Sequence, residues 1–256
     1  MIGAIAGDMI GSPYESYPIK HTNFDLVVSA FTDDTVLTIA IAYAIINEAD
    51  IASSLKKFAE KYHNLPYGSG FRRWIWSWDN KPYNSFGNGS AMRVSPVGFA
   101  YDSVEDVLHQ AERTAGVTHN HPEGIKGAQA TALAIYMARI GESRKAIRQE
   151  IADRFSYDLN RTVDEIRPNY SFDVTCQGSV PESIIAFLDS NSWEDAVKKS
   201  ISLGGDADTM ACITGGIAQA FYKKIPDNIA KDARNKLPGD LLEILDKFNT
   251  KYKCHF

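Results

Sequence analysis

The chain has 256 residues, 44% of them apolar, which is enough to bury a large core. Its 32 acidic and 27 basic residues give a net charge of −5 at pH 7, and no dense cluster of Lys and Arg stands out, so the composition argues against a nucleic-acid-binding protein. Three widely spaced cysteines, Cys176, Cys212 and Cys254, form no CxxC pair, which argues against a disulfide framework or a zinc site and fits a reducing cytoplasm.

The apolar stretches of the chain are short. Residues 36–46 are an example, and they fall well below the roughly 20 apolar residues that a helix needs to span a bilayer. The N-terminus has no basic segment before an apolar run, so it does not resemble a signal peptide. We therefore expect a cytoplasmic protein with no membrane partner.

Helical periodicity dominates the chain. Residues 35–48 are apolar on nearly every side, as in a buried central helix. Further helices, most of them amphipathic or rich in alanine, are predicted at 51–62, 103–115, 124–140, 142–156, 180–191, 193–203, 207–222, 227–235 and 240–252. Asp102 and Ser103 are candidate N-caps, and Pro181 suits a first helical turn. Alternating strand patterns are few, so the sequence predicts an all-α fold, a compact multi-helix bundle.

Two stretches lack helical periodicity. Residues 64–96 and 157–178 contain many Gly, Pro, Asn or aromatic residues and read as ordered loops or lids. Neither has the composition of a linker, so we expect one domain over residues 1–256.

The first segment with candidate chemistry is GDMIGSPYE, residues 7–15. Asp8 and Glu15 are its acids of interest. A turn with one solvated acid explains the segment equally well, so taken alone it is a weak signal.

Two acidic motifs each precede an apolar helix. The first is FTDDT at 31–35 and the second is LGGDADT at 203–209. For either motif alone an N-cap is the simpler interpretation, because Thr and Asp side chains satisfy free helical amides. The two helices are too apolar to lie on the surface, so both N-termini are expected to meet in the interior, where four carboxylates need cations. Together the motifs therefore favour a metal site.

Two further segments offer polar groups from loops. SFGNGSAMR at 85–93 is either an Asn-Gly turn or a glycine-rich loop, in which Asn88 and Ser90 bind a phosphate or sugar. THNHPEG at 118–124 holds His119 and His121, which are two residues apart and cannot share one helical face. With no further Cys or His at ligand spacing, a buried, hydrogen-bonded His119 is favoured over a zinc site.

Read in order, these segments resemble the ADP-ribosylglycohydrolase family, which includes dinitrogenase reductase-activating glycohydrolase. The matching stretches are GAIAGDMIGSPYE at 3–15, FTDDT at 31–35, GNGSAMRVSPVG at 87–98, THNHPEGIKGA at 118–128, CQGSVPESIIAF at 176–187 and SLGGDADTMACITGGIAQAFY at 202–222. The pairing of TDDT with GGDADT in this order is specific, and the resemblance covers nearly the whole chain.

The resemblance implies an orthogonal all-α bundle, expected as a monomer, with two Mg²⁺ or Mn²⁺ ions. The metal ligands that it implies are Thr32, Asp33, Asp34, Asp206, Asp208 and Thr209. The catalytic residues that it implies are Glu15, Asp34 and Asp208. The substrate-binding residues that it implies are Asn88, Gly89, Ser90, Met92, His119, Gly204 and Gly205.

The activity that the resemblance implies is hydrolysis at the anomeric carbon of ADP-ribose joined to a protein side chain, with ADP-ribosyl-arginine as the default linkage. ADP-ribosyl-serine, O-acetyl-ADP-ribose or another small ADP-ribose derivative is the alternative. Two other interpretations are a non-catalytic ADP-ribose-binding or toxin-neutralising module, and a helical protein whose Asp pairs are ordinary caps. The last of these predicts no effect of metal on stability.

Overall fold

The computed structural model describes residues 1–254, and in this range the chain is helical, with one isolated antiparallel bridge between Gly87 and Thr175. The helices are α1 Ile2–Ser16, α2 Asp33–Asn47, α3 Ile51–Lys61, α4 Ser69–Ile75, α5 Gly89–Met92, α6 Ser95–Ala100, α7 Val104–Gly116, α8 Pro122–Ile140, α9 Arg144–Phe155, α10 Val163–Ile166, α11 Cys176–Leu188, α12 Trp193–Ile201, α13 Ala207–Tyr222, α14 Asp227–Lys236 and α15 Gly239–Lys251. The predicted all-α bundle is confirmed. No described helix combines the length and the apolar character needed to cross a membrane.

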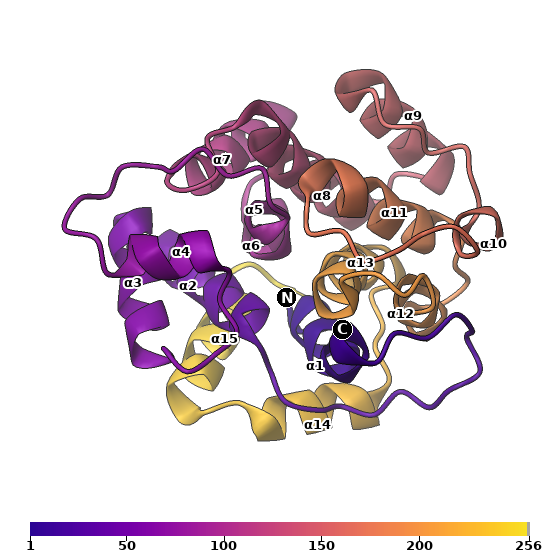
Figure 1. The fold of residues 1–256 in the computed structure, drawn as a ribbon, viewed down its shortest axis with the longest axis horizontal. Coiled ribbons are helices and arrows are strands. Elements are labelled where there is room, and N and C mark those ends of the chain that lie inside the picture. The colour runs from indigo at the N-terminus through magenta and orange to yellow at the C-terminus, as the bar shows by residue number, and fades with distance from the viewer. Residues whose placement is uncertain (255–256) are drawn as a thin grey trace.

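Helices α1 and α13 lie side by side near the middle of the molecule (Figure 1). Their contact is close because glycines of α1 face the backbone of α13. A Cβ atom added to Gly7 would lie 2.1 Å from the carbonyl oxygen of Ala211, and one added to Gly11 would lie 2.4 Å from that of Ala207. The pair brings the C-terminal half of α1 beside the first turn of α13.

Helix α2 is buried along most of its length, as its continuous apolar sequence predicts. It packs against α3, α15 and α6 and also contacts α1 and α13. Helices α1 and α2, near the start of the chain, therefore both contact α13, which comes late in the sequence.

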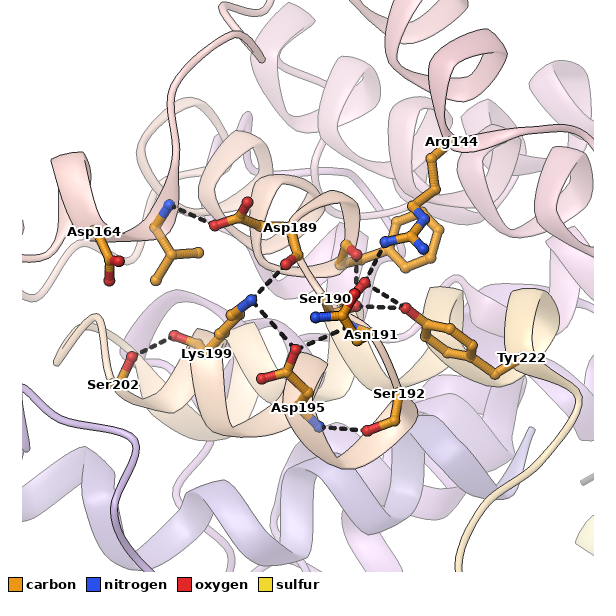
Figure 2. A network of polar contacts seen from close by, with 12 residues as sticks. Arg144, Asp164, Asp189, Ser190, Asn191, Ser192, Asp195, Lys199, Ser202 and Tyr222 are labelled. Atoms are coloured by element: carbon orange, nitrogen blue, oxygen red, sulfur yellow. Dashed lines mark hydrogen bonds and ion pairs between the residues drawn. The ribbon is translucent and has the colours of Figure 1, made fainter.

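Hydrogen bonds connect the corner between α11 and α12 to the C-terminal end of α13 (Figure 2). The carbonyl of Asp189 accepts a hydrogen bond from Lys199 Nζ. The carbonyl of Ser190 accepts from Arg144 and, at 2.7 Å, from the Tyr222 hydroxyl of α13. These cationic and hydroxyl groups satisfy carbonyls that the end of α11 leaves free.

The structure corrects the element predictions at four places. Residues 2–16, for which no helix was predicted, form α1. The predicted loop 64–96 contains α4, α5 and the start of α6, and the predicted loop 157–178 contains α10. The helix predicted to begin at 180 begins at Cys176, where Thr175 is the N-cap, so Pro181 lies inside it rather than in its first turn.

Candidate metal centre and substrate cavity

Asp8 organises the first acidic motif from α1. This fully buried carboxylate accepts hydrogen bonds from the Thr32 backbone amide at 3.0 Å and the Thr32 hydroxyl at 2.7 Å. It also accepts from the Thr35 amide at 3.2 Å and from the Thr35 hydroxyl. Asp8 is therefore neither part of a turn nor a solvated acid, and its oxygens are occupied in fixing the start of α2.

The first motif combines a helix cap with a free carboxylate. Thr32 Oγ1 accepts from the Asp34 amide at 3.2 Å, so Thr32 is the N-cap of α2. Asp34 lies in the first turn, with a residue exposure of only 2%. Its Oδ2 is buried and has no hydrogen-bond partner. A buried carboxylate oxygen without a donor is therefore a candidate ligand for a cation.

The second motif places Asp206 and Asp208 at the start of α13. Asp206 is the N-cap residue but caps no amide with its side chain; instead Asn88 Nδ2 donates to Asp206 Oδ2 at 2.7 Å. The Thr209 amide donates to Asp208 Oδ1 at 2.9 Å. Glu15, from the end of α1, joins these two acids, since one carboxylate oxygen from each of the three lies within 4.8 Å of the others.

Burial raises the pKa of each of these acids, and repulsion between cluster carboxylates adds to the shift at all of them except Asp206. Burial, followed by the neighbouring Asp8, raises the pKa of Asp33 to about 7. Burial also raises the pKa of Asp34 well above its ordinary value, and the charge of Asp208 adds to the shift. Burial is also the main cause of the raised pKa values of Asp208, Asp206 and Glu15. A cluster that resists ionisation this strongly suits hard divalent cations, which offset the repulsion and prefer oxygen ligands.

The acids open into a cavity of about 330 Å³. Its lining comprises Glu15, Asp33, Asp34, Leu37, Pro66, Gly68, Gly70, Phe71, Tyr83, Ser85, Gly87, Asn88, Gly89, Met92, Arg93, His119, Val174, Asp206, Asp208 and Thr209. The loop at Gly87–Gly89 is held by two backbone hydrogen bonds across the bridge, from Asn88 N to Val174 O at 2.8 Å and from Cys176 N to Phe86 O at 2.9 Å.

Some of the residues expected to bind substrate lie elsewhere. Asn88, Gly89, Met92 and His119 line the cavity. Ser90 is fully buried and donates its hydroxyl hydrogen to the Gly124 carbonyl at 2.7 Å, outside the lining.

The glycine pair of the second motif also lies outside the lining of the cavity. Gly204 has a φ of +65° and packs against Lys20, and Gly205 packs against Tyr170. These glycines therefore shape the turn that presents Asp206. Thr32 likewise does not line the cavity, and its hydroxyl connects Asp8 to the start of α2.

The two histidines of the fourth segment have separate roles. His121 is the N-cap of α8 and accepts from the Glu123 amide at 3.1 Å. His119 is buried in the cavity wall, and its Nδ1 lies 2.7 Å from the Thr118 hydroxyl. Burial, and then the nearby Arg93 cation, lower the pKa of His119 well below its ordinary value. His119 is therefore neutral at physiological pH.

Several cavity residues were not predicted. Phe71 and Tyr83 come from the region expected to be a loop, and Val174 precedes α11. The aromatic content of residues 64–96 was the available signal. Aromatic content predicts that these side chains are buried, but it does not identify the surface on which they pack.

Comparisons with known proteins identify the family of the chain. The family model described as ADP-ribosylglycohydrolase matches residues 1–254. Human ADP-ribosylhydrolase ARH3 is 27% identical, over 94% of this chain and 90% of that protein. The ADP-ribosylarginine hydrolase Tri1 of Pseudomonas putida is 23% identical, over 87% of this chain and 69% of that protein.

A solved structure, titled as an ADP-ribosylglycohydrolase-related protein complex, superposes with a TM-score of 0.74 at 21% identity, over 100% of this chain and 97% of that one. At that identity the likeness shows the fold alone. The family match over residues 1–254, together with the converging acidic motifs, leads to one conclusion: the chain belongs to the ADP-ribosylglycohydrolase family and is a glycosidase of ADP-ribose linkages.

Proposed function

We propose that this protein removes ADP-ribose from modified arginine side chains of proteins by hydrolysis at the anomeric carbon. The observation that carries the proposal is the convergence of Glu15, Asp33, Asp34, Asp206 and Asp208 on one cavity that also contains Asn88, Gly89 and His119. Arginine is the proposed linkage because the guanidinium group of the bound substrate is positively charged, which an acidic cavity accommodates, and because one relative, Tri1, is named an ADP-ribosylarginine hydrolase.

The residues present fit two Mg²⁺ or Mn²⁺ ions. All of the candidate ligands offer oxygen, as hard cations prefer, and Asp34 Oδ2 is unpartnered. Asp33 and Asp34 would hold the ions from the start of α2, and Asp206, Asp208 and Thr209 from the start of α13. Thr32, the sixth predicted ligand, has its hydroxyl bound to Asp8 outside the cavity lining and would instead support this set by fixing the start of α2. When bound, such ions supply positive charge for the ribose hydroxyls and lower the pKa of a bound water.

The side chains around the acids have distinct tasks. Asn88 holds Asp206 in place through its 2.7 Å hydrogen bond. Glu15 is half-buried at the end of α1. One of its carboxylate oxygens lies within 4.8 Å of a carboxylate oxygen of Asp206 and of one of Asp208. In its ionised form Glu15 would take a proton from the attacking water. Because departure of the side chain gives the anomeric carbon oxocarbenium character, nearby carboxylates also stabilise that charge.

A panel of defined linkages tests the proposal. The purified protein is incubated with arginine-ADP-ribosylated peptide, serine-ADP-ribosylated peptide and O-acetyl-ADP-ribose, each with Mg²⁺ and with EDTA, and released ADP-ribose is measured. We expect Mg²⁺-dependent release from the arginine peptide. Release from only one of the other two substrates would reassign the linkage, and tight binding of ADP-ribose without release from any substrate would contradict the proposed reaction.

A further inference from the structure

Arg93 is a fully buried cation beside the cavity. One guanidinium nitrogen donates to the Thr114 carbonyl at 2.9 Å and to the Thr118 hydroxyl at 2.7 Å. Nε and the other terminal nitrogen have no hydrogen-bond partner, and within residues 1–254 no acid forms an ion pair with Arg93. Its charge faces the carbonyl end of α7 and, at 6.0 Å, the ring of Phe71.

Arg93 determines the direction of the next hydrogen bond. A guanidinium only donates, so the Thr118 oxygen must accept from it. Thr118 is itself fully buried, and among the described residues the acceptor within reach of its hydroxyl hydrogen is His119 Nδ1, at 2.7 Å. A buried hydroxyl hydrogen left without an acceptor is costly. The Thr118 hydroxyl therefore donates to Nδ1, which carries no proton.

The proton of His119 is then on its other ring nitrogen. The imidazole is neutral, because burial and the Arg93 charge lower its pKa. Nε2 has no hydrogen bond within the described part of the chain and lies beside the glycine loop, where a Cβ atom on Gly89 would be 3.1 Å away. His119 is only 5% exposed, and it lines the cavity.

We propose that Arg93 is a positioning residue that acts through Thr118 to hold His119 as its Nε2–H tautomer. The cavity thereby offers an uncharged N–H donor beside Gly89 to an oxygen atom of ADP-ribose. This donor is uncharged, so it leaves the net charge of the cavity unchanged. That the acceptor belongs to ADP-ribose rests on the proposed function. The assignment of the His119 tautomer is independent of it.

A matched pair of variants tests the relay. Thr118→Val removes the hydroxyl with little change of shape, and Thr118→Ser keeps it. The ¹⁵N chemical shifts of the His119 ring distinguish the protonated from the unprotonated nitrogen without any substrate. We expect Nε2–H in the wild type and in Thr118→Ser, and a mixture of tautomers in Thr118→Val. A proton on Nδ1 in the wild type, or identical spectra for the two variants, would overturn the positioning role.

Binding of ADP-ribose measures the consequence. By titration calorimetry, we expect Thr118→Val to bind ADP-ribose about tenfold more weakly, the effect of one hydrogen bond, and Thr118→Ser to bind like the wild type. Arg93→Lys keeps the charge but not the forked geometry, and is expected to resemble Thr118→Val. Equal affinities despite a changed tautomer would refute the donor role. A wild type that shows Nε2–H but cleaves no ADP-ribosyl linkage would refute the proposed function and leave the positioning role intact.

Discussion

Asp8 supports the site through four hydrogen bonds without lining the cavity. From the sequence it was one acid in a glycine-containing segment, since nothing in GDMIGSPYE reveals that its partners are Thr32 and Thr35. The TDDT motif was recognised, but the residue that holds it was not. A long-range hydrogen-bond partner is a property of helix packing and has no local sequence signal.

Substitution of Asp8 tests this supporting role. Asp8→Asn replaces one acceptor oxygen with a donor. Oδ1 accepts from one buried donor and Oδ2 from three, so at least one buried donor loses its partner. We expect the free energy of unfolding, measured by urea denaturation, to fall by about 2–4 kcal/mol. Asp25→Asn, at an exposed acid, is the control and should leave stability unchanged. A loss below about 0.5 kcal/mol for Asp8→Asn would show that the carboxylate is dispensable.

His119 gives the stability a defined dependence on pH. Its folded pKa lies well below the ordinary value of 6.5. As the pH falls below 6.5, the unfolded chain takes up a proton that the folded protein does not, so stability is lost with acidification. His119→Gln lacks this contribution. Between pH 7.5 and 5, denaturation curves should show the wild type losing up to about 1.4 kcal/mol per pH unit more than the variant. Parallel curves would contradict a neutral buried histidine.

The packing of α1 against α13 sets the site at the scale of helices. α1 was not predicted because its glycines and Pro13 read as turn signals and its apolar residues show no single face. In the structure those glycines are contact points, since a Cβ atom at Gly3, Gly7 or Gly11 would collide with α13. Tertiary packing thus overrides helix propensity here. By contrast, α13 was predicted at its observed bounds, 207–222, because an acidic motif precedes a long, mostly apolar run.

A glycine substitution tests the close approach of these helices. Alanine favours helix by about 1 kcal/mol, but Gly7→Ala would press its methyl group into the Ala211 carbonyl. We expect a net loss of about 3 kcal/mol in the free energy of unfolding. Gly239→Ala, in the first turn of α15 with nothing within 4 Å of the added Cβ, is the matched control and should be neutral or slightly stabilising. Equal effects of the two substitutions would contradict the packing account.

At the scale of the whole molecule, the cavity joins segments from nearly the full length of the chain. Its acids come from α1, α2 and the start of α13, and the amide of Asn88 reaches Asp206 across 118 positions of sequence. Motif composition was enough to predict that the two acidic motifs meet. It was not enough to predict the wall formed by Phe71 and Tyr83, because aromatic residues in a loop do not specify which surface they cover. Ser90 shows a different limit. Its polar side chain in a glycine-rich segment predicted substrate binding, but its hydroxyl donates to the backbone carbonyl of Gly124 instead.

Metal-dependent release of ADP-ribose from an arginine-ADP-ribosylated peptide tests the central claim most directly. The wild type, Asp34→Ala and Asp208→Ala are compared over a Mg²⁺ titration, and thermal melting is recorded on the same samples. We predict that release by the wild type requires Mg²⁺, that Mg²⁺ raises its melting temperature by binding only the folded state, and that both variants lose turnover and this thermal shift while remaining folded. Near-normal release by either variant, or wild-type release that is unaffected by EDTA, would contradict the assignment of these carboxylates to a metal centre.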